Sequence, residues 1–470
     1  VAGDQCVQGT TRVNCTADGS VRTDYNVRVS VCVAGLLEPN CRVYPNGTGK
    51  PIGLLQRYGE DNQMLFGLLT GSYINNTQGG VLRRNMGRFS SEVIPNTGQF
   101  SNFQGIVRTI DAMRIVDFRN DAFSYQGGWV SNQPMTPANF PDWANPIGEM
   151  MYESLRYFGG KAAPTPAYVA NITGGIETVT VRNPASTLSL PAPAWNDPYD
   201  RDGGQPWCSR PANLVISDTS PSFDSDSVPG SAFATFSGDL AGFNATSEAN
   251  AIWAAEHGGS SMHFIGTSGA VSDSTPSPKL VSGLGNVRGL SPEEPTRQGS
   301  YYAASAARFG QRSDLRPDLR GIQNPQTYAV ALASPLPKIE FPVGNGRITL
   351  VPFSKSTSGT FGGTINAGQG QFQPTNQIVD FYIERWANTD ASNMDLTLNG
   401  GRPYAKFRVN YEDVEQGADH DMDMIVSYTL QVDTLGRLQV QLVSEYAAGG
   451  IEQAAGYAIS GSNADGVYIE

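Results

Sequence analysis

The sequence is poor in the residues on which catalysis and nucleic-acid binding usually depend. Only three of its 470 residues are histidine, and 32 lysine and arginine residues stand against 44 aspartate and glutamate residues. The formal net charge of −12 argues against binding to nucleic acid, because no basic stripe is present to neutralise phosphates. The same charge is compatible with divalent cations as partners.

Long apolar runs are also missing. No segment approaches the roughly 20 apolar residues that a membrane-spanning helix needs, so the sequence predicts no membrane span. Residue 1 is Val rather than Met and no signal peptide is present, from which we expect a processed or trimmed product. Ile469 and Glu470 lie in strand-like sequence, and we therefore expect the gene product to continue.

No familiar catalytic motif is present. The sequence has neither a Gly-x-Ser-x-Gly elbow nor a His-Glu-x-x-His zinc motif, and no glycine-rich phosphate loop precedes a helix. A Ser-His-Asp triad has only His257, His263 and His420 as candidate bases. His257 and His263 flank a glycine-containing stretch and are either metal ligands or solvated loop residues. We predict that the chain is not an enzyme.

Five cysteines are present, and none has the Cys-x-x-Cys spacing of metal or haem sites. Eight residues separate Cys6 from Cys15, and the same number separates Cys32 from Cys41. Two short disulfide-closed loops are typical of an exported protein, and each closure contributes roughly 2–3 kcal/mol in the chain-entropy model. Cys208 is then either a buried thiol or the partner of a cysteine in a missing segment. The alternative is five free thiols in a cytosolic protein.

The length of 470 residues allows two or three domains. A charged fraction of only 16%, with 53 glycines and 30 prolines, indicates a loop-rich extracellular protein. We divide the chain into three parts: a polar, disulfide-closed arm over residues 1–24, an α/β domain with long loop insertions over residues 25–338, and a β-rich module over residues 339–470.

The stretch 213–218 is the clearest candidate for a ligand-binding strand. Its apolar Leu-Val-Ile run ends in Ser-Asp, as in a parallel strand that is buried on both faces. Open α/β sheets bind their ligands at the carboxyl ends of such strands. Asp224 and Asp226 follow Asp218, so oxygen ligands suited to a hard cation are dense here. The alternative is an ordinary strand followed by a solvated acidic loop.

Strand-like and helix-like patterns alternate before residue 338, which favours a doubly wound α/β domain. Asn145 is expected to cap one of the helices, with Pro146 at its first position. Residues 161–202 are expected to form a loop, and residues 260–292 show no periodicity. The predicted strands are 25–33, 63–73, 213–217 and 327–333, and the predicted helices are 105–116, 145–158, 247–257 and 299–309.

Strand patterns alone follow residue 338, and no helical pattern competes with them. They predict an all-β module with the architecture of a sandwich. The predicted strands are 339–353, 378–386, 404–411, 424–432, 438–446 and 457–460.

The densest acidic cluster runs from Glu412 to Asp423, and its candidate metal ligands are Asp413, Glu415, Asp419, Asp421 and Asp423. In a loop, residues spaced two apart can turn several carboxylates towards one calcium ion. In an extended strand they share a face and repel each other unless a cation joins them. The glycine and the closing glutamate of an EF-hand are misplaced. The alternative is a charged hairpin loop without a metal.

Several segments in order carry a family resemblance. They are 36–47 (LLEPNCRVYPNG), 64–73 (MLFGLLTGSY), 79–83 (GGVLR), 213–218 (NLVISD) and the acidic cluster at 413–423. Together they resemble the PilY/PilC-type tip-associated proteins of type IV pili, and the likeness runs from about Tyr25 to the end of the sequence.

The resemblance implies a von Willebrand factor A-like domain followed by β modules. It also implies an exported protein that acts at the pilus tip in adhesion and pilus assembly. In an A-domain, an Asp-x-Ser-x-Ser loop, a Thr and an Asp hold calcium or magnesium. Here Asp218 resembles that last Asp and Asn145 occupies the Thr position, whereas the Asp-x-Ser-x-Ser loop is not found before them. The family's C-terminal propeller has no counterpart either.

The function predicted is therefore that of an extracellular pilus-tip adhesin, exported through the periplasm and cation-dependent. Its partners are expected to be pilin or minor pilins, a host or surface ligand, and an N-terminal fragment of the same precursor that supplies the missing metal loop. One alternative is a structural subunit of an extracellular filament or secretion machine, which packs through exposed strand edges. A second alternative is a secreted hydrolase with an unfamiliar site.

Overall fold

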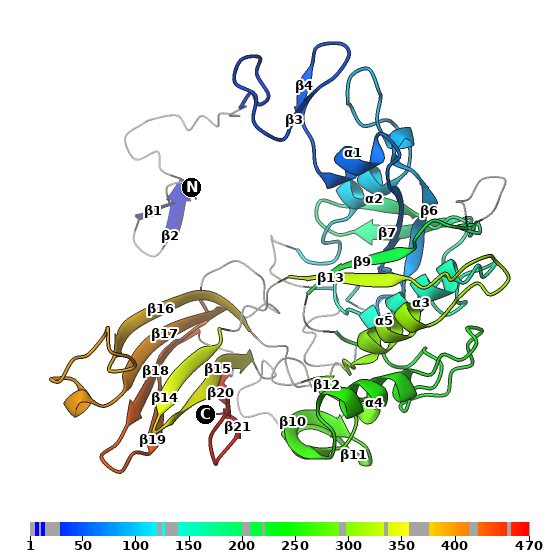
Figure 1. Ribbon diagram of the computed structural model, residues 1–470. Helices are drawn as coiled ribbons and strands as arrows, with labels where there is room; N and C mark the ends of the chain where they lie inside the picture. The colour runs from blue at the N-terminus through cyan, green and yellow to red at the C-terminus, as the bar shows by residue number, and fades with distance from the viewer. Residues whose placement is uncertain are drawn as a thin grey trace. The chain divides into compact units, whose positions relative to one another are not determined.

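The computed structural model divides the chain into two compact units, Val1–Met64 with Arg88–Ser101, and Leu65–Gly87 with Asn102–Glu470 (Figure 1). The predicted domain boundaries after residues 24 and 338 stay predictions. The residues that the structure describes are 5–8, 11–14, 29–119, 125–126, 140–199, 207–218, 221–290, 298–332, 337–356, 376–412, 422–448 and 453–469.

The first unit has short elements and a disulfide between Cys32 and Cys41. The strand predicted at 25–33 is wrong in its described part, because residues 29–33 are irregular apart from an isolated bridge between Val33 and Leu36. The side chains of Cys6 and Cys15 lie outside the described part, so their pairing stays a prediction. The elements are the hairpin of β1 (Gln5–Gln8) and β2 (Thr11–Asn14), the hairpin of β3 (Cys41–Val43) and β4 (Gly49–Pro51), α1 (Leu54–Gly59) and η1 (Phe89–Glu92).

The helices predicted for the α/β region are present, and three of them share one hydrophobic core. In this core Tyr152 stacks on Phe243, with 5.2 Å between ring centroids, and Phe309 meets Phe243 edge-on at 5.2 Å. Gly159 ends the helix that was predicted at 145–158, as expected. The helices are α2 (Ile106–Ala112), α3 (Ile147–Phe158), α4 (Ala245–Glu256) and α5 (Tyr302–Arg312), of which the last three form the core.

The predicted strands at 213–217 and 327–333 pair in parallel, as Figure 1 shows for β9 (Ala212–Ser217) and β13 (Gln326–Ala331). Leu214 lies opposite Tyr328 in this register. The prediction that both faces are buried is wrong. Val215 packs against the helical core, but Leu214 on the other face is 65% exposed.

Two predicted loops contain antiparallel strands. Residues 161–202 include the hairpin of β7 (Ile176–Val181) and β8 (Ser186–Pro191). Residues 260–292 include β10 (Ser261–Ser268), β11 (Val271–Val281) and β12 (Val287–Leu290), with β10 in the middle. Ser- and Thr-rich sequence obscured these strands, because only part of each alternation is apolar.

The last part of the chain is the predicted β-sandwich, built from two four-stranded sheets. Both sheets contribute to one core, in which Phe407 stacks on Tyr428 and Phe341 meets Trp386 edge-on. The first sheet has the order β14 (Ile339–Val343), β15 (Gly346–Ser356), β20 (Gln453–Ser460) and β21 (Gly466–Ile469). The second has the order β16 (Gln377–Ala387), β17 (Tyr404–Glu412), β18 (Met424–Val432) and β19 (Leu438–Ala447).

The chain is thus mostly β with few helices. Among the described residues the doubly wound sheet is not confirmed, since β9 and β13 form a parallel sheet of two strands. The strand predicted at 63–73 is present as β5 (Leu65–Thr70), but it pairs with β6 (Val81–Arg88) instead of joining β9. In the described part of the chain, every helix is too short or too polar to cross a bilayer.

Candidate functional site

The end of β9 and the start of α3 meet at a polar corner. The Asn145 side chain donates from Nδ2 to Ser217 Oγ at 2.9 Å and to Asp218 Oδ1 at 2.8 Å. The Asn145 backbone is also held, because its N donates to Ser222 Oγ at 2.8 Å and its O accepts from Ser222 N at 2.9 Å. We call these four residues the Asn145 corner. It brings together two predicted metal-ligating residues that are 73 positions apart in the sequence.

The prediction that Asn145 caps α3 is wrong. The cap position is Pro146, which makes no side-chain cap bond, and the Asn145 amide reaches the end of β9 instead. The first turn of α3 lies very close to the loop after β9. A Cβ at Gly148 would lie 2.9 Å from both the carbonyl oxygen and a carboxylate oxygen of Asp224. Glycine at position 148 therefore permits the close approach of α3 to the loop after β9.

The Asn145 corner was tested for its fit to the predicted divalent cation by the oxygen atoms that it offers. Asp218 offers one exposed carboxylate, and Ser217 and Ser222 offer hydroxyls. Because Mg²⁺ and Ca²⁺ take roughly six or more oxygen ligands, and carboxylates among them for charge balance, these groups form only one side of such a site. The chemistry of the donor set fits a hard cation, and its completion requires ligands from beyond these residues.

Two carboxyl groups are buried behind the corner. Glu149 of α3 accepts hydrogen bonds from Gly79 N and Ser227 N, both at 2.7 Å, and Asp224 accepts one from Ser300 N at 2.8 Å. Burial raises the pKa of the Glu149 carboxyl to about 8 and that of the Asp224 carboxyl to about 7. Both groups therefore hold a proton more readily than ordinary carboxylates, and they tie α3 to the loops around it.

The predicted calcium loop lies between β17 and β18. Its residues Asp413, Glu415, Asp419 and Asp421 lie outside the described part of the chain. Asp423 is buried, and its carbonyl oxygen accepts hydrogen bonds from Ala448 N at 2.7 Å and Gln453 Nε2 at 3.1 Å.

Glu412 is fully buried at the end of β17, one position before the loop. Tyr411 pairs with Met424, and beyond this pair a Glu412 carboxylate oxygen accepts a hydrogen bond from Met422 N at 3.3 Å. Glu412 is the first residue of the acidic run in the sequence, although it was not among the predicted metal ligands.

One cluster in the first unit has the geometry of a metal site without its chemistry. Ligand atoms of Cys32, Glu38 and Cys41 lie within 4.8 Å of one another, which holds for no other such trio among the described residues. The two cysteines are joined in a disulfide and cannot supply thiolates. Glu38 instead accepts a hydrogen bond from Cys32 N at 2.9 Å. Cys208, the remaining cysteine, is exposed, so the expectation that it is a buried thiol is wrong.

The candidate histidines surround an aromatic ring. His257 stacks on Trp253 with 4.6 Å between centroids, and His263 meets the same ring edge-on at 5.5 Å. His263 Nε2 shares a hydrogen bond of 2.8 Å with Ser261 Oγ. Burial lowers the pKa of His263, with a smaller contribution from the charge of His257. No carboxylate in the described residues hydrogen-bonds either imidazole, so the part of a triad that orients the base is missing here.

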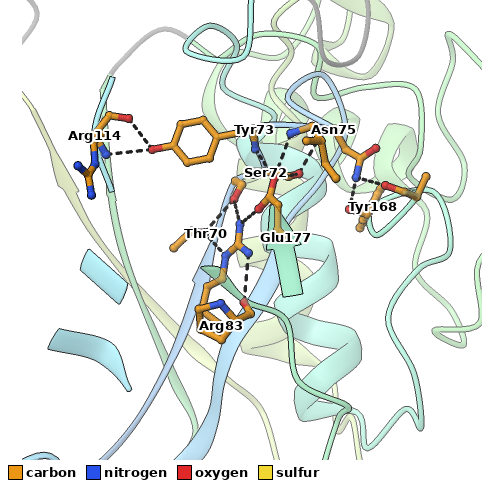
Figure 2. Close-up of polar contacts among 12 residues, drawn as sticks. Thr70, Ser72, Tyr73, Asn75, Arg83, Arg114, Tyr168 and Glu177 are labelled. Atoms are coloured by element: carbon orange, nitrogen blue, oxygen red, sulfur yellow. Dashed lines mark hydrogen bonds and ion pairs between the residues drawn. The ribbon is translucent and has the colours of Figure 1, made fainter. Parts of the chain in front are cut away.

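A buried ion pair that the sequence analysis missed joins β6 to β7 (Figure 2). Arg83 and Glu177 are both fully buried, and Arg83 Nη2 contacts Glu177 Oε2. The other Glu177 oxygen accepts hydrogen bonds from Ser72 Oγ at 2.8 Å, Tyr73 N at 2.7 Å and Ile74 N at 3.0 Å. This network fixes the loop that follows β5.

The remaining donors of Arg83 are also satisfied. They reach Thr70 Oγ1 at 2.8 Å, the Gly71 carbonyl at 2.8 Å and the Pro191 carbonyl at 3.1 Å. Glu177 stands on the same face of β7 as buried valines, and a glutamate among apolar residues of one strand face was the available signal. The network positions the backbone and exposes no reactive group, so we interpret it as structural.

Comparisons with known proteins identify the family. A family model described as "PilY1 homolog, second domain" matches residues 66–310, and one described as "PilY1 homolog, beta-sandwich" matches residues 341–470. The chain is similar to the type IV pilus biogenesis factor PilY1 homolog of Xylella fastidiosa (strain Temecula1), with 48% identity over 496 residues. The match includes all of this chain and 32% of that protein, so the chain spans about a third of the length of this relative. No solved structure matches the chain.

Proposed function

This chain belongs to the family of PilY1 homologs, and from that membership we propose that it forms the second domain and the β-sandwich of an extracellular factor in type IV pilus assembly and adhesion. The observation that carries the proposal is the full-length similarity to a protein named as a type IV pilus biogenesis factor. Because that relative is about three times as long, the function belongs to the whole protein, and this chain contributes binding surfaces to it.

The proposed role is binding rather than catalysis. The histidines that a hydrolase needs lack an orienting carboxylate in the described residues, and the buried Arg83–Glu177 pair is enclosed by backbone. Pilin or minor pilins at a pilus tip are the proposed partners, together with a ligand on a host or other surface. The proposed location is the cell surface or the pilus tip.

We further propose that adhesion depends on a divalent cation. An A-like site would use Asp218 and the Asn145 side chain, which the fold brings into hydrogen-bond contact. When bound, calcium or magnesium would supply positive charge for a carboxylate of the adhesion ligand. A second cation would occupy the loop 413–421, where the buried Glu412 and Asp423 stand at its base.

A genetic experiment tests the function. The gene is deleted in its source bacterium and restored as wild type, as an Asp218→Ala, Asn145→Ala variant, or as a Glu340→Gln control that changes an exposed carboxylate in β14. Sheared surface pilin and attachment to a surface are measured with and without divalent cations. We expect deletion to reduce both, the corner variant to retain pili but lose cation-dependent attachment, and the control to behave as wild type.

Each outcome bears on a different part of the proposal. A deletion strain with normal piliation and attachment would refute the function. If the corner variant attaches normally with cations and loses attachment in chelator, as expected of the wild type, the role of the Asn145 corner is refuted. The proposed function of the protein is not affected by that result. Quantifying this protein against pilin in sheared filaments tests the alternative of a filament subunit, which predicts comparable copy numbers.

The calcium loop is tested with the purified chain. At a Ca²⁺ concentration about 100 times the dissociation constant, binding to the folded state alone stabilises it by about 2.7 kcal/mol. We expect thermal unfolding to shift upward with Ca²⁺ relative to chelator, and the shift to vanish in an Asp421→Asn, Asp423→Asn variant but not in Glu340→Gln. An unchanged unfolding temperature with and without chelator in the wild type would dispose of this site.

A further inference from the structure

The two faces of the β9–β13 pair carry different side chains. Paired residues in a parallel register share a face, so Val215 and Ala329 lie on one side. There Val215 packs against the helical core, whereas Ala329 and Ala331 of β13 are exposed. The other side carries large apolar side chains whose exposed fractions are unusually high. They are Leu214 at 65%, Ile216 at 63%, Tyr328 at 62%, Val330 at 49% and Leu332 at 56%. We call these five residues the open face.

Such a face is at odds with the physics of parallel sheets. Parallel strands are connected by crossovers that place helices over the sheet, so sheets of this type are normally covered on both faces. A contiguous group of large apolar side chains in water is also uncommon on a protein that acts alone. Among the described residues, β9 and β13 further lack any other hydrogen-bonded strand, so their outer edges offer unpaired ladder groups.

The β5–β6 pair and the β9–β13 pair contact the same hydrophobic cluster. Met86 of β6 and Val215 of β9 pack against the same hydrophobic cluster, to which α3 contributes Tyr152 and Leu155. The β5–β6 pair and the β9–β13 pair thus lie against one helical layer, yet they are separate sheets.

We propose that the open face and an edge of the β9–β13 pair are the docking surface for the first domain of PilY1-type polypeptides. That domain would add a parallel strand to the pair and cover the open face with an amphipathic helix. The occupant is argued from the match itself, since the model over residues 66–310 describes a second domain and the similar protein is about three times as long. The proposal rests on family membership and does not depend on adhesion or on a bound cation.

Co-production with the first domain tests the proposal. The first domain of the Xylella fastidiosa relative, with one affinity tag, is expressed in the same cells as this chain carrying another. We expect the two to co-purify as a 1:1 complex. In one of the strands Ala212–Ser217 and Gln326–Ala331, the amides that do not face the other strand should exchange more slowly in the complex than in this chain alone. Ile216→Glu and Tyr328→Glu should each reduce the recovered complex at least tenfold. Leu435→Glu, which changes an equally exposed apolar residue in the β18–β19 turn, should not.

A loss of complex in the two variants can be distinguished from misfolding. Ile216 and Tyr328 are already in solvent, so both variants should unfold at the wild-type temperature when produced alone. A complex that forms equally well with both variants would overturn the proposal, as would strand amides that exchange at the same rate with and without the first domain. Self-association of this chain that both variants abolish would assign the open face to a second copy and also overturn it. Loss of piliation in the genetic experiment has no bearing on this outcome.

Discussion

Removal of the buried ion pair should destabilise the second unit locally and strongly. Arg83→Met deletes the cation and leaves the Glu177 carboxylate enclosed, whereas Glu177→Gln deletes the charge but keeps one oxygen for three donors. Breaking a buried pair from one side typically costs about 3–5 kcal/mol. We expect about 4 kcal/mol for Arg83→Met. The expected cost of Glu177→Gln is smaller, about 2–3 kcal/mol, because Arg83 keeps its carbonyl acceptors.

The double variant separates the pair from its surroundings. If Arg83 and Glu177 stabilise each other, the combined variant should be less destabilised than the sum of the single variants by at least about 1 kcal/mol. Denaturant unfolding gives the free energies, and hydrogen exchange over residues 65–74 and 176–191 locates the loss. Single variants within about 1 kcal/mol of wild type, or strictly additive effects, would refute the reasoning that this pair joins the two hairpins.

Three further predictions concern other parts of the chain. The pKa values of Glu149 and Asp224, about 8 and about 7, exceed the roughly 4 of unfolded carboxyls, so the folded state binds more protons between these limits. Their contribution to stability is therefore complete below about pH 4 and is lost as the pH rises to about 8. Between pH 5 and pH 9 the unfolding temperature of Glu149→Gln should fall less than that of the wild type. An equal fall in both proteins would contradict the assignment. Gly148→Ala should lower the unfolding free energy by about 1–3 kcal/mol because its Cβ meets Asp224 backbone, and an unchanged denaturant midpoint would contradict this close approach. Replacing Cys32 and Cys41 by serine should cost the first unit about 2–3 kcal/mol, measured as faster proteolysis before Met64 than in wild type, and equal rates would exclude a stabilising role.

The β-sandwich was largely predictable from sequence. Its strands alternate between apolar and polar residues, as β18 does, because one face of each sheet packs in the core and the other meets water. The helices were predictable for a similar reason, since the period of α3 and α5 matches the face that each buries. The hairpin β7–β8 was not predictable to the same degree, because threonine and serine fill its exposed positions and resemble a loop.

The candidate site shows where local pattern stops being informative. The sequence placed Asp218 at the end of a parallel strand and paired it with Asn145, and the fold brings the two into contact. It also assigned Asn145 to a helix cap, because a cap and a long-range hydrogen bond use the same short amide side chain. Which of them forms depends on whether the end of β9 lies within reach, and that is a tertiary property.

The sequence by itself indicated the helices, the strands of the β-sandwich and the family, because periodicity and motifs act over a few neighbouring residues. Only the tertiary structure decided which apolar faces are covered. Leu214 and Val215 are adjacent and similar in hydrophobicity, yet Val215 packs in the helical core and Leu214 stands in water. Burial depends on the three-dimensional neighbours of a strand, and for β9 the structure shows those neighbours on one side alone.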